Sequence, residues 1–73
     1  MKQQFFIGLN VGKKEMVINA TTNIDCLPPD INCYIGSVTS TISEIKRNAP
    51  LFLKEFNQLN TTNIERVKFN FNQ

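Results

Sequence analysis

The side chains that could carry out chemistry are few in this chain of 73 residues. It contains no histidine, and histidine is both the usual general base and the commonest metal ligand in proteins. Most serine and cysteine nucleophiles are activated by an imidazole, so the ordinary form of those triads is excluded. The sequence therefore predicts a protein that is not an enzyme and that has no small-molecule substrate.

Two cysteines and two aspartates form the densest group of reactive side chains. Cys26 and Cys33 enclose a short segment that contains Asp30, and Asp25 precedes the first cysteine. A structural zinc site needs four ligands, usually cysteine and histidine. A nucleophilic thiol needs a nearby cation or helix N-terminus to stabilise its thiolate, and neither is evident in this segment. We therefore expect two reduced, structural thiols, no metal site and no cofactor.

A binding role is better supported than a catalytic one, because aromatic, basic and amide side chains are predicted to share one face of a sheet. Phe6 lies in the middle of this set. An aromatic ring surrounded by cations and amides can stack on a nucleobase while the cations hold its phosphate. Alternatively, Phe6 packs across the strands on Val17 and the alkyl part of Lys68, or contacts a second protein. The candidate residues on this sheet face are Phe6, Asn10, Val17, Arg66 and Lys68.

Alternating hydrophobicity predicts where the strands that carry this set lie. In Gln3–Val11 every second residue from Phe5 onward is apolar, which is typical of a half-buried strand. Glu15–Ala20 alternates in the same way after a turn at Gly12–Lys14, so the two segments are expected to form a β-hairpin. Glu65–Phe71 repeats the pattern and is expected to be the last strand.

The middle of the chain is predicted to be helical. Thr21–Asp30 is a proline-containing loop, and Ile31–Ile35 is either a short strand or the entry to a helix. The helix is expected to start near Ser37, although Thr41 and Glu44 also fit a capping box one turn later. Apolar residues recur at helical spacing, at Ile35, Val38, Ile42, Ile45 and Ala49.

Pro50 falls inside this helical pattern. A proline inside a helix costs about 3 kcal/mol or more, whereas a proline in the first turn costs little. We therefore expect a break at Asn48–Pro50 and a second helix over Pro50–Leu59. This second helix is too apolar to lie free in solvent, which makes it a candidate binding surface. Its candidate residues are Leu51, Leu53 and Phe56.

Together these elements predict a single α+β domain over residues 1–73, in the order ββααβ. The expected sheet is three-stranded and antiparallel, of order 2-1-3, with both helices packed on one face. Both edge strands are then open, and an open edge can pair with a strand of another chain. Because a chain of this length buries only a small core, a partner subunit would add useful burial.

The remaining bounds concern charge and membranes. The net charge of +2 is too small to indicate a polyanion partner by itself. No segment approaches the roughly 20 apolar residues of a membrane span. The apolar run near Met1 ends at Asn10 and is followed by charged residues, which does not fit an export signal. We therefore expect no membrane association and a cytoplasmic location.

The prediction for function combines these results. The sequence favours a small non-enzymatic protein-interaction module that regulates or inhibits a larger protein, with a homodimer as one form in which it could act. The alternative is a single-stranded nucleic-acid-binding protein that uses the open sheet face. The two differ in salt dependence, because binding to phosphates weakens steeply as salt is added.

Overall fold

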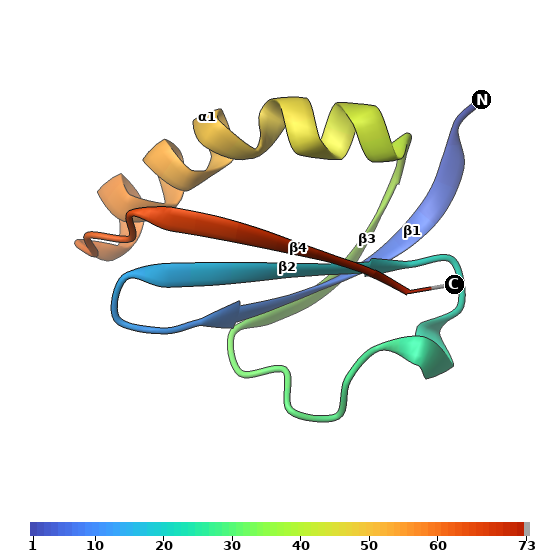
Figure 1. The fold of residues 1–73 in the computed structure, drawn as a ribbon, viewed down its shortest axis with the longest axis horizontal. Coiled ribbons are helices and arrows are strands. Elements are labelled where there is room, and N and C mark those ends of the chain that lie inside the picture. Colours follow the sequence, from blue (N-terminus) through green and yellow to red (C-terminus); the bar gives the residue numbers. More distant parts are fainter. Residues whose placement is uncertain (73) are drawn as a thin grey trace.

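The computed structural model describes residues 1–72 and places them in one mixed sheet with a single long helix. The four strands lie in the order β3-β1-β2-β4. Figure 1 shows α1 on one side of the strands and an irregular loop on the other. The elements, in chain order, are β1 (Gln3–Val11), β2 (Glu15–Thr21), a 3-10 turn (Ile24–Cys26), β3 (Tyr34–Ser40), α1 (Ile42–Asn60) and β4 (Arg66–Asn72).

The predicted hairpin is confirmed. β1 has the expected bounds, and β2 is one residue longer than expected. The strands are antiparallel, with Leu9 opposite Ile18, because this register keeps the alternate apolar side chains of both strands on one face. The N–H of Gly12 donates to the C=O of Glu15 at 2.8 Å and closes the turn. Gly12 has no positive φ, so the turn does not use the conformational freedom of glycine.

The segment Tyr34–Ser40 is a strand, so the predicted helix start near Ser37 is wrong. β3 runs antiparallel beside β1, and only the last two residues of Ile31–Ile35 belong to it. Valine, threonine and serine fill its second half, and β-branched side chains favour strands over helices. The helical spacing was misleading because Ile35 and Val38 lie on opposite faces of this strand.

The helix begins at Ile42, at the later of the two predicted start signals. The Thr41 hydroxyl oxygen accepts the N–H of Glu44 at 3.1 Å, which satisfies one of the free donors of the first turn. The carboxylate of Glu44 accepts the hydroxyl proton of Ser40, also at 3.1 Å. The change from strand to helix is therefore fixed by hydrogen bonds between neighbouring residues.

The helix continues through Pro50, so the predicted break at Asn48–Pro50 and the separate second helix are wrong. Pro50 is exposed, so water can satisfy the carbonyl group that a residue with an N–H would have bonded. Figure 1 shows α1 bending along its length, which is the usual effect of a proline inside a helix. Ala49 and Leu53, on either side of the proline, both pack on the sheet, and this packing holds the two halves together.

The predicted fold, a three-stranded antiparallel sheet of order 2-1-3 with two helices, is therefore wrong. The last strand, β4, pairs in parallel with β2 and lies beside β2 rather than beside β1. β3 occupies the place beside β1 that the prediction gave to the last strand. β1 is nevertheless an interior strand, paired on both sides.

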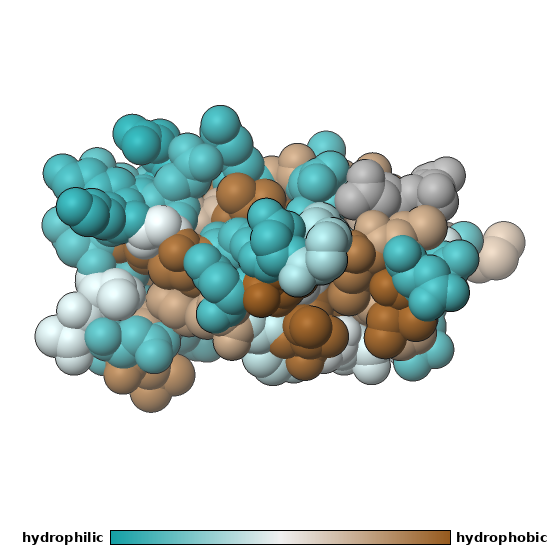
Figure 2. All heavy atoms as spheres, turned by 90° about the horizontal axis from the view of Figure 1, so that it is seen from below, coloured by the Kyte–Doolittle hydropathy of each residue, from teal (hydrophilic) through white to brown (hydrophobic). Residues whose placement is uncertain are grey.

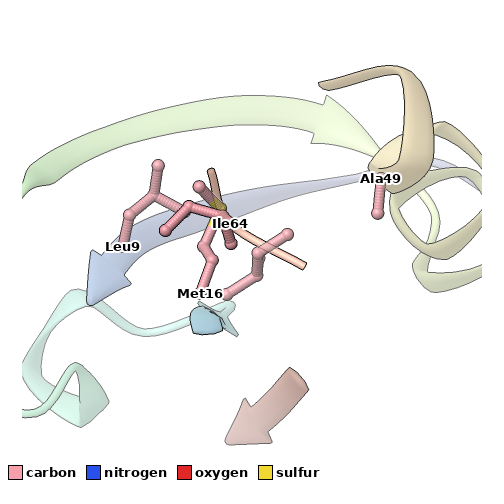
Figure 3. Packing of buried hydrophobic residues seen from close by; sticks show 5 residues of the cluster. Leu9, Met16, Ala49 and Ile64 are labelled. Atoms are coloured by element: carbon pink, nitrogen blue, oxygen red, sulfur yellow. The ribbon is translucent and has the colours of Figure 1, made fainter. Parts of the chain in front are cut away.

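The main core lies between the sheet and α1. Figure 3 shows Leu9, Met16 and Ile64 close together, with Ala49 on α1. Ile64 was not predicted as a core residue. It is held by the side chain of Asn57, whose Nδ2 donates to the Ile64 C=O at 3.0 Å and whose Oδ1 accepts the Ile64 N–H at 2.9 Å. The buried apolar residues of this core are Leu9, Met16, Ile18, Ala49 and Ile64.

The loop between β2 and β3 covers part of the other face of the sheet. Leu27 and Ile31 pack over Gly8, where an added Cβ would lie 2.6 Å from Ile31 Cδ1 and 3.5 Å from Leu27 Cδ2. Asn32 fastens the loop to β1: its side chain accepts the Val11 N–H at 2.9 Å and donates to the Val11 C=O at 3.3 Å. This face was expected to be open, and the structure gives it a small apolar contact instead.

The contact over Gly8 can be tested by substitution. We expect Gly8→Val to lower the free energy of unfolding by about 1–3 kcal/mol, because the new methyl groups overlap Ile31. The matched variant is Gly12→Val, where an added Cβ meets nothing closer than the Glu15 carbonyl oxygen at 3.5 Å. Urea unfolding followed by circular dichroism measures both. Equal effects of the two variants would contradict the packing of the loop on β1.

Candidate functional site

The predicted sheet-face residues lie on one side of the sheet, but the loop partly covers them. Phe6 and Val17 are half-buried. The side chain of Asn10 donates to the C=O of Asp30 at 2.7 Å, which brings the loop across the end of β1. Figure 2, seen from the loop side, shows hydrophobic groups interrupted by hydrophilic ones on this face. Phe6 therefore lies on a partly covered surface rather than on an open platform.

The two predicted cations of this face share one carboxylate. Arg66 Nε lies 3.7 Å and Lys68 Nζ 3.6 Å from the carboxylate oxygens of Glu15 on β2. The side chains of Arg66 and Lys68 are 66% and 69% exposed, so these contacts add little to stability. A phosphate that approached these cations would also meet the negative charge of Glu15.

A row of side-chain amides crosses the same face. Asn70 Nδ2 donates to Asn19 Oδ1 at 3.1 Å. Asn19 Nδ2 lies 2.9 Å from Asn10 Oδ1 and 3.1 Å from the Gly8 C=O, and can donate to both. Asn19 is only 2% exposed, and a buried amide without partners would be costly. The row therefore joins β4, β2, β1 and the loop, and its amides are occupied by internal bonds.

The predicted helix residues divide between core and surface. Leu53 and Phe56 pack against the main core, which leaves little of either side chain for a partner. Leu51 is 60% exposed. Phe52, which was not a predicted site residue, is 39% exposed and lies against Phe56, with ring centroids 6.2 Å apart. Phe52 borders a groove that the sequence did not predict.

This groove lies between α1 and β3 and is almost entirely apolar. We call it the β3–α1 surface and define it by Ile7, Tyr34, Val38, Ile45 and Phe52. It encloses about 270 Å³. Tyr34 and Val38 are 52% and 43% exposed, and the ring of Tyr34 lies where a Cβ on Gly36 would be. The sequence did not predict this surface, because the apolar spacing around Val38 favoured a helix there rather than a strand.

β3 also ends the sheet without a neighbour. Among the described residues, its backbone ladder is with β1 alone. Its seven residues include no charged residue and no proline. Charged residues and prolines are the features that usually protect an edge strand from pairing. β4, at the other edge, carries Arg66 and Lys68, and Lys46 of α1 lies 5.4 Å from the ring centroid of Phe71. The unprotected edge is therefore the one beside the β3–α1 surface.

The role of the amide row can be measured. We expect Asn19→Ala to lower the free energy of unfolding by about 1–3 kcal/mol, because Asn10 Oδ1 and the Gly8 C=O lose their donor inside the protein. Asn70→Ala removes the donor to Asn19 Oδ1, but Asn70 is exposed, so water can take its place and the variant should cost less than Asn19→Ala. Chemical denaturation of both variants gives the comparison. A cost at Asn19 as small as that at Asn70 would contradict a structural role for the row.

Three further findings bound the chemistry of the chain. No cluster of three or more metal-ligating side chains occurs within residues 1–72, and Cys26 and Cys33 are free thiols. No helix in the described part of the chain is long and apolar enough to cross a membrane. Comparison with protein-family models, with curated proteins and with solved structures gave no match. The feature of the described residues that favours a binding role is therefore the β3–α1 surface.

Proposed function

We propose that this protein is a non-enzymatic protein-interaction module that binds another polypeptide at the β3–α1 surface and its adjoining edge. The observation that carries the proposal is the juxtaposition of an unprotected edge strand with an exposed apolar groove. An open edge offers a row of backbone donors and acceptors, and the groove offers apolar area beside them. Regulation or inhibition of a larger protein is the role that such a module would have.

This combination fits strand addition, a common mode of polypeptide recognition. A partner strand gains affinity from main-chain hydrogen bonds along the edge, while side-chain pockets select its sequence. On the helix side, alternate residues of an added strand would meet Tyr34, Val38 and Phe52, which are large, apolar and already exposed. Aromatic side chains of this kind are enriched among the residues that dominate binding energy.

The proposal is tested by capture followed by reconstitution. Tagged protein is incubated with lysate of the native host, each captured protein is purified, and its affinity is measured by calorimetry. We expect the affinity to fall at least tenfold in Phe52→Lys, because a lysine replaces an apolar contact with a charge that must be desolvated.

The matched control for this experiment is Ile24→Lys, which adds the same charge at an exposed isoleucine in the 3-10 turn, outside the surface. Ile24→Lys should leave the affinity unchanged. A partner that binds both variants as tightly as the unmodified chain would place the binding site elsewhere, and the proposal would fail.

The alternative function, binding of single-stranded nucleic acid at the sheet face, is tested in a separate assay. Because Phe6 is half-buried on a face that the loop contacts at Gly8 and Asn10, and Glu15 pairs with Arg66 and Lys68, we expect no binding of labelled single-stranded DNA or RNA at low salt. Fluorescence anisotropy with a mixed-sequence oligonucleotide measures this. Binding that weakens with added salt and is lost in Phe6→Ala would instead favour the sheet face as the functional surface.

A further inference from the structure

We infer that the polypeptide that occupies the β3–α1 surface is a second copy of this chain. In this arrangement β3 pairs antiparallel with β3 of the second copy about a two-fold axis at Ser37, and the two sheets become continuous. The inference rests on the proposed function, since it names the partner of that same surface. Three properties of β3 support it: the direction of its backbone groups, the pattern of its side chains, and its lack of charge.

The direction of the backbone groups follows from the hairpin. Gly12 bonds to Glu15 on β2, and neighbouring residues of a strand point their N–H and C=O groups to opposite sides. Val11 accordingly bonds in the other direction, to Asn32, and Leu9 accepts the N–H of Cys33. The odd-numbered residues of β1 therefore face β3.

The register between β1 and β3 then identifies the free groups of the edge. Ile7 lies opposite Gly36 and Phe5 opposite Val38, so the even-numbered residues of β3 bond to β1. The outward groups belong to Ile35, Ser37 and Thr39. With the axis at Ser37, Ser37 pairs with itself and Ile35 pairs with Thr39 of the second copy. Every outward N–H of the edge then meets a C=O of the other copy.

The side chains on the helix side of β3 are complementary in the same register. They read Tyr34, Gly36, Val38 and Ser40, which alternate between large and small. Pairing about Ser37 sets Tyr34 opposite Ser40 of the second copy. It sets Val38 opposite Gly36 of the second copy, over which the ring of Tyr34 lies, so Val38 would pack against that ring. Neither Tyr34 nor Val38 lies opposite its equivalent.

Charge agrees with a self-complementary interface, and the length of the edge limits its size. β3 carries no charged residue, so antiparallel pairing with itself brings no like charges together. The edge is about 23 Å long for a seven-residue strand, and the helix layer does not reach it, because α1 packs on residues of β1, β2 and β4. Pairing along this edge therefore buries less than the roughly 800 Å² per partner of a standard interface. We therefore expect a weak, reversible dimer.

Sedimentation equilibrium of the full chain, from about 1 μM to about 1 mM, tests the inference. We expect a monomer–dimer equilibrium for the unmodified protein. Ser37→Pro removes an outward N–H and leaves the ladder to β1 intact, so it should raise Kd at least tenfold while thermal unfolding at low concentration stays unchanged. Val38→Lys, which adds a charge on the helix side of the edge, should weaken the dimer in the same way. If Ser37→Pro does not fold, the Kd of Val38→Lys decides whether the inference stands.

The control is Ile24→Lys, which should dimerise like the unmodified protein. A chain that remains monomeric up to 1 mM overturns the inference, as does a dimer that both edge variants leave intact. The proposed function fails separately. If the chain is monomeric but a captured protein loses affinity in Phe52→Lys, the surface binds a different polypeptide and the proposed function stands. If neither self-association nor the binding of a captured protein depends on the β3–α1 surface, the inference and the proposed function both fail.

Discussion

One α-helix is narrower than a sheet of four strands, and this difference determines which strands α1 covers. Strands are spaced about 4.8 Å apart, so a four-stranded sheet is roughly 15–20 Å wide, whereas one α-helix with its side chains is about 10–12 Å across. A single helix that runs along the strands, as α1 does beside β2 and β4 in Figure 1, leaves part of such a sheet uncovered. Here α1 packs its apolar residues over β1, β2 and β4, and β3 is left with its helix side exposed. The groove follows from the number of elements rather than from any single residue.

The two edges of the sheet differ in how well they are protected from pairing with another strand. At β4, Lys46 reaches over Phe71, and Arg66 and Lys68 carry charge along the strand, so that edge resists pairing. At β3, no charge interrupts the strand, and Tyr34, Val38 and Phe52 remain partly exposed beside it. In a small domain, burial of such a surface against another chain also adds stability that the isolated core lacks. The proposed binding at this edge would therefore also stabilise the fold.

The sequence predicted the parts of the fold in which local pattern and packing agree. The hairpin and the last strand alternate strictly, and their apolar faces were assigned correctly. The prediction failed where two periodicities overlapped: Ile35 and Val38 belong to a strand, yet they continue the helical spacing of Ile42 and Ile45. The predicted helix break at Pro50 was wrong for another reason. Packing on both sides of a proline can outweigh the loss of the hydrogen bond that the proline removes. The candidate surface lies between β3 and α1, so the two wrong predictions, of a helix near Ser37 and of a break at Pro50, prevented its recognition. The β-branched and hydroxyl residues after Gly36 were a signal for a strand.

The proposed pairing places a second copy of this chain at the edge beside the β3–α1 surface. Amide hydrogen exchange, followed residue by residue in dilute and concentrated solution, reports on each N–H of this edge. We expect the amides of Ile35, Ser37 and Thr39 to exchange rapidly in dilute solution and to become protected as concentration rises, while Gly36 and Val38 are protected throughout by β1. Exchange at Ile35, Ser37 and Thr39 that is equally fast at every concentration would overturn the pairing.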